Sequence, residues 1–210
     1  MKNAKGFFLV LIFAVVAFAA CKSTKGFEGN ANLTIMIVDE NDRAVDDFEV
    51  SLYRNIKIIP DFESSAFTNK NGLCVFYNIP GGEYILQGQK YGYSKIILGQ
   101  FDFNNRSDLY CYRVYSAGYI LEQAEQFYKK AEYHKALELL EKLSTQEGTL
   151  LQNTVSFYKA YGYARLNQKE KAGLELQKIT EYQNPAFDST KYCGAIEQIT
   201  EQLLQAKPDA

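Results

Sequence analysis

The hydrophobic period of this chain changes once, near Ser116, and that change constrains the fold more than any other feature. Between residues 33 and 115, apolar residues alternate with polar ones, as at Phe48, Val50 and Leu52. A period of two indicates strands with one buried face. After Ser116 the apolar residues recur at intervals of three and four, which indicates amphipathic helices. We therefore predict an α+β chain of two domains, a β-rich one followed by a helical one.

Turn residues divide the β-rich half at intervals of about ten residues, which is typical of an antiparallel β-sandwich. Asn69 to Gly72 and Pro80 to Gly82 carry the strongest of these turn signals. The segment from Asn55 to Ser65 contains Pro60 and shows no clear alternation, so we expect it to be irregular. The remaining apolar runs predict strands at residues 33–38, 48–53, 73–78, 84–88, 96–103 and 109–115.

The order of turn and strand residues in the β-rich half matches a known domain pattern. Thr68 to Gly72 precedes Phe76, the run from Asn78 to Tyr84 reads N-I-P-G-G-E-Y, and Tyr91 to Tyr93 follows. Together these residues resemble the carboxypeptidase regulatory-like domain, a transthyretin-like sandwich. The resemblance implies such a sandwich over residues 32–115, and it implies no catalytic residues.

The helical half repeats small and large residues at a separation of 36 residues. Four pairs of positions show this separation: Ala124 and Ala160, Phe127 and Tyr163, Ala136 and Ala172, and Leu140 and Leu176. Pro185 marks the end of the second unit. The pattern resembles tetratricopeptide repeats, which are paired helices with a period of about 34 residues. The resemblance implies α-helical hairpins over residues 117–206, with a last helix at 189–205 that caps one end.

Tetratricopeptide repeats bind peptides along a groove lined by the first helix of each unit. By position, the residues that would face such a groove here are Leu121, Glu125, Tyr128, Lys129, Phe157, Tyr161 and Arg165. Aromatic residues and Arg are the types that anchor protein interfaces. The alternative interpretation is that Tyr128 and Phe157 belong to the packed core.

The first 21 residues have the order of a bacterial export signal. Lys2 and Lys5 precede an uncharged run from Gly6 to Ala20, which is shorter than the roughly 20 residues that span a bilayer. The two small residues before Cys21 resemble the lipobox of bacterial lipoproteins. The resemblance implies a signal peptide at residues 1–20, and diacylglycerol with an N-acyl chain such as palmitate on Cys21.

Two other interpretations of this segment stay open. Ala17 to Ala19 also fits a cleavage site that would release a soluble secreted product. The apolar run could instead remain as an uncleaved anchor. In the lipoprotein interpretation, residues 21–31 carry the lipid and form a polar tether that lifts the folded part from the membrane.

Composition and the scarcity of reactive residues argue against several functions. The formal net charge is −2 and no basic block is present, so we predict no nucleic-acid partner. His134 is the single histidine, and its place near a turn between helices favours a solvated surface role over catalysis. No nucleotide-binding or metalloprotease motif occurs. We expect no catalytic residues, no metal and no cofactor.

Two clusters leave alternatives open. The acidic residues between Asp39 and Asp47 could hold calcium, although their spacing fits a solvated turn better. Cys74 and Cys111 could form a disulfide within the sandwich, although small buried side chains are the simpler interpretation.

These observations predict a non-catalytic lipoprotein of the bacterial cell envelope. It would be held at a membrane through Cys21 and would bind another envelope protein or peptide as a scaffold or assembly accessory. The sequence does not distinguish the inner membrane, the outer membrane and the cell surface. The alternative is a lipoprotein that binds carbohydrate or peptidoglycan through exposed aromatics of the sandwich such as Tyr91, Tyr93 and Phe101.

Overall fold

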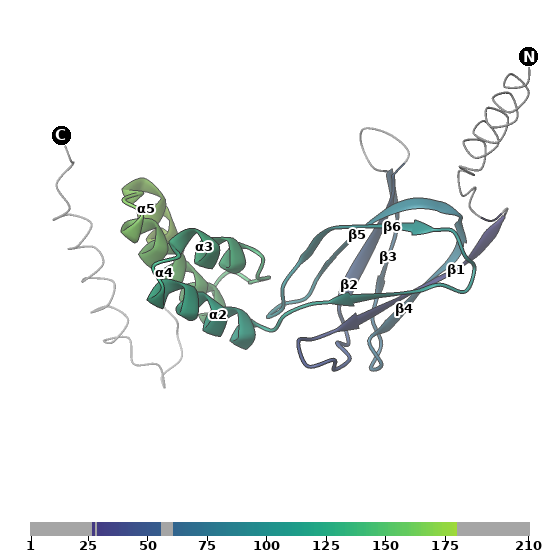
Figure 1. Cartoon of the computed structure of the whole chain (residues 1–210), viewed down its shortest axis with the longest axis horizontal. Coiled ribbons are helices and arrows are strands. Elements are labelled where there is room, and N and C mark those ends of the chain that lie inside the picture. The colour runs from purple at the N-terminus through teal and green to yellow at the C-terminus, as the bar shows by residue number, and fades with distance from the viewer. Residues whose placement is uncertain (1–26, 28, 56–60, 180–210) are drawn as a thin grey trace, which may run out of the picture.

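The structure is a computed structural model, and it describes residue 27 and residues 29–55 and 61–179. A β-sandwich and a helical part lie side by side along the longest axis (Figure 1). The strands are β1 (Asn30–Val38), β2 (Glu49–Arg54), β3 (Asp61–Phe67), β4 (Leu73–Pro80), β5 (Gly82–Gln89), β6 (Ile96–Phe103) and β7 (Leu109–Arg113). The helices are α2 (Ala117–Lys129), α3 (Tyr133–Glu141), α4 (Leu150–Arg165) and α5 (Lys169–Gln177). The fold is therefore α+β, with the sandwich ahead of four helices in pairs.

The sandwich consists of two sheets with different strand orders. One sheet has three strands in the order β4-β1-β7, and the other has four in the order β3-β2-β5-β6. Neighbouring strands are antiparallel except β1 and β7, which run parallel from Thr34 opposite Leu109 to Val38 opposite Arg113. This parallel pair differs from the all-antiparallel expectation. Parallel neighbours need a long crossover connection, and here the five strands β2 to β6 lie between β1 and β7 in the chain.

The alternation in the sequence produces the core between the sheets. Leu33, Ile35 and Ile37 of β1 face Val50 and Leu52 of β2 across the sandwich, and all five are fully buried. The same cluster contains buried residues of other strands and loops, namely Val45, Phe48, Cys74, Phe76, Ile79, Tyr84, Leu86, Phe103 and Val114. Burial of these side chains is the main stabilisation of the sheets against each other.

The prediction that residues 55–65 are irregular is wrong from Asp61 onward, because β3 begins there. β3 is one of the two edge strands of the four-stranded sheet and pairs only with β2 among the described strands. Its sequence, DFESSAF, is mostly polar and mostly exposed. An edge strand is held by backbone hydrogen bonds to one neighbour, so it needs no apolar alternation, and the periodicity test cannot detect it.

The turn between β3 and β4 explains the Thr68 to Gly72 motif. Asn69 Oδ1 accepts hydrogen bonds from the backbone N–H groups of Asn71 (2.8 Å) and Leu73 (3.2 Å). Gly72 has φ of 72°, and a Cβ there would lie 2.5 Å from the carbonyl oxygen of Ile37. Both the backbone angle and the lack of space require glycine at this position.

Thr68 joins this turn to the loop before β2. Its buried hydroxyl accepts a hydrogen bond from the backbone N–H of Phe48 (2.9 Å) and donates one to the carbonyl oxygen of Val45 (2.7 Å). Two backbone groups in the core are therefore satisfied by one side chain.

The two helical pairs share the same backbone features at a separation of 36 residues. α2 and α4 end 36 residues apart, and so do α3 and α5. The turn residues Ala131 and Asn167 have φ of 57° and 58°. In each turn the same hydrogen bond closes the pair, from Glu132 N to Phe127 O and from Gln168 N to Tyr163 O, both at 2.9 Å.

Small residues allow the helices of each pair to pack closely. Ala124, Ala136, Ala160 and Ala172 are all fully buried. Gly162 of α4 has no room for a side chain, because a Cβ there would lie 2.7 Å from Tyr128 Oη. The four alanines occupy the positions at which the sequence predicts small residues.

The sandwich and the helices share a hydrogen-bonded junction built on residues 90–95, the loop between β5 and β6. The N–H of Gly92 donates a hydrogen bond to the carbonyl oxygen of Ser144 (3.0 Å). The N–H of Ser144 in turn donates one to the carbonyl oxygen of Tyr93 (2.8 Å). The carbonyl oxygen of Gly92 accepts from the N–H of Ala117 at the start of α2 (2.7 Å). The loop therefore holds α2 and the segment after α3 together against the sandwich.

Candidate functional site

The residues predicted to line a groove on α2 and α4 are mostly brought together. Glu125 and Tyr128 of α2 lie beside Phe157 and Tyr161 of α4, linked through the intervening Tyr158. Two other predicted residues differ in exposure, since Leu121 is half-buried against the helical core and Lys129 is exposed. Arg165 lies at the end of α4 and contacts α3 rather than α2.

Four tyrosines form the centre of this surface, and we call Tyr128, Tyr133, Tyr158 and Tyr161 the tyrosine cluster. The ring of Tyr128 is stacked with Tyr158 at a centroid distance of 6.1 Å and meets Tyr161 edge-on at 5.3 Å. Tyr133, the first residue of α3, is tilted against Tyr128 at 6.2 Å. All four side chains are half-buried.

The hydroxyl of Tyr128 is fixed by the backbone. It donates a hydrogen bond to the carbonyl oxygen of Tyr158 (2.6 Å). Burial raises the pKa of Tyr128 above its ordinary value, and the neighbouring tyrosines raise it further. Tyr128 therefore stays neutral and is a fixed part of the contact between α2 and α4.

A charged side chain lies at each end of the tyrosine cluster. Arg165 Nε donates a hydrogen bond to Tyr133 Oη (3.2 Å), and the guanidinium lies 5.6 Å from the centre of that ring. The hydrogen bond raises the pKa of Arg165, so the group stays charged. At the other end, the hydroxyl of Tyr158 donates to the carboxylate of Glu125. The surface thus joins aromatic rings to one basic and one acidic group.

Sequence reasoning missed Tyr133 and Tyr158 as members of this surface. Tyr133 precedes His134, which the sequence places near a turn between helices, and Tyr158 lies outside the predicted groove positions. Tyr158 is three residues before Tyr161 on α4, so the two project from the same helical face. That spacing was the available signal. No local signal places Tyr133, because its contact with Arg165 joins two helical pairs.

The residues proposed for glycan binding do not form one surface. Phe101 of β6 pairs with Tyr84, at the end of β5 opposite the loop that contains Tyr91. Its ring is half-buried between Tyr84 and Tyr110. Tyr93 is half-buried against the sandwich core, and Tyr91 is exposed. The expectation of exposed rings is therefore wrong for Tyr93 and Phe101.

The acidic residues of the first turn have separate partners. Asp42 pairs with Arg113, and Asp46 pairs with Lys90 at 3.0 Å. Glu40 accepts hydrogen bonds from Ser116. Within the described ranges, no three His, Cys, Asp or Glu residues are grouped so that they could hold a metal ion.

The cysteines of the sandwich cannot bridge one another. Cys74 of β4 lies opposite Ile35, and Cys111 of β7 lies opposite Met36, so β1 separates them. Cys74 is buried in the core and Cys111 is exposed, and both are free. The disulfide alternative is wrong, and so is the expectation of two buried thiols.

Several predictions concern parts of the chain outside the described residues. These parts are the export segment with Cys21, the tether up to residue 26 and the last helix at 189–205. His134 is described, and it is exposed at the start of α3. Among the helices that the structure describes, none is long and apolar enough to cross a membrane.

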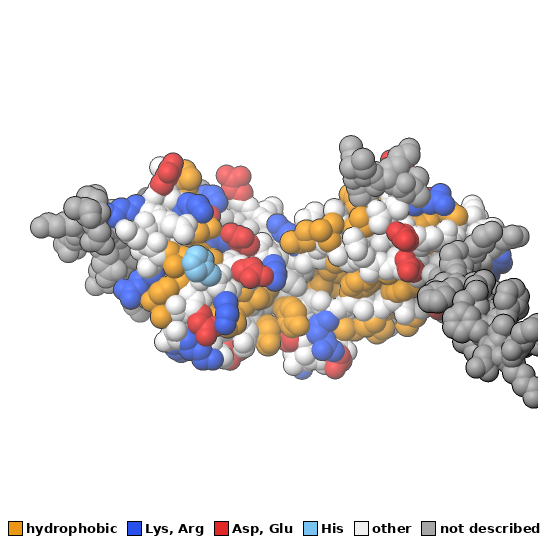
Figure 2. All heavy atoms as spheres, turned by 45° about the horizontal axis from the view of Figure 1, so that its top comes forward, with side chains coloured by type: hydrophobic (Ala, Val, Ile, Leu, Met, Phe, Trp, Pro, Cys, Tyr) orange, Lys and Arg blue, Asp and Glu red, His pale blue; other side chains and the backbone are white. Residues whose placement is uncertain are grey.

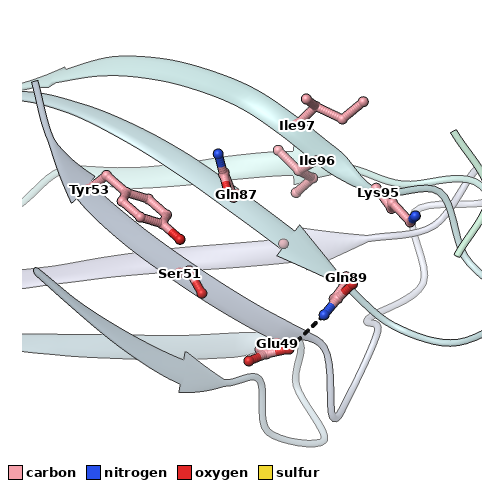
Figure 3. Close-up of a pocket in the computed structure, with 9 residues that line it drawn as sticks. Glu49, Ser51, Tyr53, Gln87, Gln89, Lys95, Ile96 and Ile97 are labelled. Carbon is pink, nitrogen blue, oxygen red and sulfur yellow. Dashed lines mark hydrogen bonds between the residues drawn. The ribbon is translucent and has the colours of Figure 1, made fainter. Parts of the chain in front are cut away.

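A depression of about 320 Å³ lies on the outer face of the four-stranded sheet (Figure 3). We call it the sheet trough. Its lining residues come from β2, β5 and β6 and the loop before β6, namely Glu49, Ser51, Tyr53, Gln87, Gly88, Gln89, Lys95, Ile96 and Ile97. Figure 2 shows bands of hydrophobic side chains over the sandwich and mixed charges over the helices.

Comparison with known proteins shows a distant similarity in fold and does not assign the chain to a family. No family model and no curated protein matches the chain. Among solved structures, a streptococcal ancillary pilin is similar over 42% of this chain and 30% of its own, with 13% identity and a TM-score of 0.37. The major pilin subunit of Bacillus cereus is similar over 41% of this chain and 30% of its own, with 15% identity and a TM-score of 0.34.

A shorter protein is matched over most of its length. The 5-hydroxyisourate hydrolase of Klebsiella pneumoniae is similar over 41% of this chain and 85% of its own, with 18% identity and a TM-score of 0.31. The chain spans less than a third of the two pilins. The sandwich thus distantly resembles pilin and transthyretin-like folds, and this likeness carries no information about function.

Proposed function

We propose that this protein is a membrane-tethered lipoprotein of the bacterial envelope that binds another protein through the tyrosine cluster and performs no catalysis. The observation that carries the proposal is the set of four half-buried tyrosines framed by Glu125 and Arg165. Tyr and Arg are over-represented among the residues that contribute most to binding energy at interfaces. The resemblance of the helical half to tetratricopeptide repeats, which bind peptides, supports the same role.

The packing of the tyrosine cluster favours binding of a second protein. Tyr128 is held by its hydrogen bond to Tyr158, and Arg165 is held over Tyr133. Side chains that are already ordered lose little conformational entropy when a partner binds. The partner would supply an apolar or aromatic side chain for the rings and a carboxylate for the exposed guanidinium of Arg165.

Photo-crosslinking from the tyrosine cluster tests this role directly. A photo-reactive phenylalanine analogue at position 161 should crosslink one discrete envelope protein in living cells. The same analogue at position 77, an exposed tyrosine of β4, should not capture that protein. Tyr161→Ala combined with Arg165→Ala should weaken binding of the identified partner at least about tenfold.

A matched control separates the cluster from general surface changes. Tyr77→Ala combined with Arg43→Ala removes the same residue types from exposed positions on the sandwich. This variant should bind the partner as the wild type does. Equal binding by all three proteins, or the same partner captured from position 77, would rule out the cluster.

Membrane attachment through Cys21 is the second part of the proposal. Each buried methylene of an acyl chain contributes about 0.8 kcal/mol, so several chains on one residue give durable attachment. Cells grown with labelled palmitate should incorporate the label into the wild-type protein and not into Cys21→Ser. A mature protein that enters the aqueous phase of a detergent extraction would contradict attachment.

A further inference from the structure

The sheet trough has uncharged polar side chains on its floor. Ser51 of β2 lies directly opposite Gln87 of β5, and both project from the outer face of the sheet (Figure 3). The hydroxyl of Tyr53 lies in the same depression, one row along β2. An amide and two hydroxyl groups offer both hydrogen-bond donors and acceptors within a small area.

The trough is lined by one acidic and one basic side chain, so their formal charges sum to zero. Glu49 and Lys95 are the two ionisable side chains of opposite sign that line it. The carboxylate of Glu49 accepts a hydrogen bond from Gln89 Nε2 (3.1 Å) (Figure 3). A strongly charged ligand would meet one like charge for each opposite charge, so the electrostatics favour a neutral one.

The backbone of the trough floor is not available to a peptide strand. β2 is paired on both sides, with β3 and β5, and β5 is paired on both sides, with β2 and β6. A peptide that adds to a sheet needs the free backbone groups of an edge strand. A ligand on this floor therefore cannot bind by adding a strand to β2 or β5.

Apolar side chains border the polar floor on two sides. On β3, Phe67 lies opposite Glu49 and Phe62 opposite Tyr53, so both phenylalanines share the outer face. Phe62 also meets the ring of Tyr53 edge-on at a centroid distance of 5.5 Å. On β6, Ile97 lines the trough from the other side. The exposed fractions of Phe62, Phe67 and Ile97 are 60%, 61% and 55%.

We propose that the sheet trough binds a neutral glycan chain. A sugar ring has hydroxyl groups at its edge and C–H groups on its faces, so it can bond to the floor and contact the aromatic border together. The volume is at the lower end of the range of about 300–1,000 Å³ for small-molecule sites, which suits a short stretch of a chain that continues beyond the trough. The proposal uses none of the residues of the tyrosine cluster and does not depend on it.

Electrophoresis through native gels that contain a polysaccharide tests this proposal. The full mature chain with Cys21→Ser would be run through gels containing arabinoxylan, mixed-linkage β-glucan, galactomannan or glycol chitin, with polygalacturonate as the anionic comparison. We expect at least one neutral polysaccharide to retard the protein, and polygalacturonate to leave its migration unchanged. Gln87→Ala should raise the dissociation constant about tenfold, since a hydrogen-bonding group of the floor is lost.

The controls keep the test decisive. Gln87 is exposed, so its replacement should leave the melting temperature unchanged, and Tyr53→Ala provides a second variant of the trough. Tyr77→Ala removes an exposed aromatic from the other sheet and should bind like the wild type. The proposal is overturned if no neutral polysaccharide retards the protein, if polygalacturonate retards it as strongly, or if Tyr77→Ala and Gln87→Ala have equal effects.

Discussion

The carboxylate of Glu40 accepts two hydrogen bonds from Ser116, the residue that caps α2. The backbone N–H of Ser116 lies 2.9 Å from one carboxylate oxygen, and its hydroxyl lies 2.6 Å from the other. The same hydroxyl oxygen accepts a hydrogen bond from the N–H of Tyr119 in the first turn of α2. A residue in the first turn of the sandwich therefore fixes the residue at which the helical half begins.

Neutralising Glu40 should reduce stability in a pH-dependent way. Burial alone would raise the pKa of Glu40, but the two hydrogen bonds from Ser116 outweigh it and the net shift is downward from 4.5. A lowered folded-state pKa stabilises the protein above the unfolded value, and this contribution is lost as the pH falls through the folded value. Glu40→Gln should cost about 1 kcal/mol near neutral pH, because the group is only partly buried.

Urea unfolding of the wild type and Glu40→Gln across pH measures this effect. The difference between their free energies of unfolding should shrink as the pH falls below about 4.5. Glu122→Gln, at an exposed position of α2, should show no such trend. A constant difference across the whole range would contradict the assignment.

Adding one methyl group at Gly162 should destabilise the helical part. A Cβ there would lie 2.7 Å from Tyr128 Oη and 3.0 Å from a side-chain carbon of Leu137. Overpacking of this kind costs about 1–3 kcal/mol, which exceeds the gain of about 1 kcal/mol in helix propensity. Gly118→Ala is the matched control, because no atom lies within 4 Å of its added Cβ. Thermal unfolding should show a lower midpoint for Gly162→Ala and an equal or higher one for Gly118→Ala.

Replacing Thr68 by valine should weaken the sandwich while keeping its shape. The variant leaves the N–H of Phe48 and the carbonyl oxygen of Val45 without their side-chain partner. Each unsatisfied buried group costs about 1–3 kcal/mol, so the two groups together should lower the free energy of unfolding by about 2–6 kcal/mol. Thr34→Val on β1, where the side chain is half-buried, should change stability by less than about 1 kcal/mol. Equal effects at the two positions would show that the hydroxyl of Thr68 has no special role.

The two described thiols should differ strongly in reactivity. Cys111 is exposed, whereas burial raises the pKa of Cys74 to about 12. Since the thiolate is the reactive form, iodoacetamide at mildly alkaline pH should label Cys111 at least about a hundredfold faster than Cys74. Peptide mass analysis at timed intervals gives each rate separately. Comparable rates, or a bridge between the two residues, would contradict the placement of β4 and β7 on either side of β1.

The spacing of apolar residues in the sequence predicted the strands and helices that bury one face and expose the other. The alternation at Phe48, Val50 and Leu52 became a buried face, because adjacent strand residues point to opposite sides of a sheet. The 36-residue separation of Ala136 and Ala172 became a recurrence of helix ends and turn hydrogen bonds. For the candidate site, Tyr128 and Tyr161 do meet, because first helices of neighbouring units pack together.

The remaining features depend on contacts between residues far apart in the chain. β3 carries no apolar pattern, since a neighbouring strand holds it by backbone hydrogen bonds. Tyr133 joins Arg165 across 32 positions, and no spacing rule connects them. The sheet trough likewise exists only because three strands place their outward side chains in register.

The sequence by itself determined the two kinds of secondary structure, the place where one gives way to the other and the separation of the helical units. Those properties follow from which side of each element is apolar, and that information is local. Tertiary structure alone decided the parallel pairing of β1 with β7, the opposite environments of Cys74 and Cys111, and the hydrogen bonds from Ser116 to Glu40. Strand order and long-range hydrogen bonds depend on which strands and which polar groups come together in the folded chain. The spacing of apolar residues along the sequence does not specify those partners.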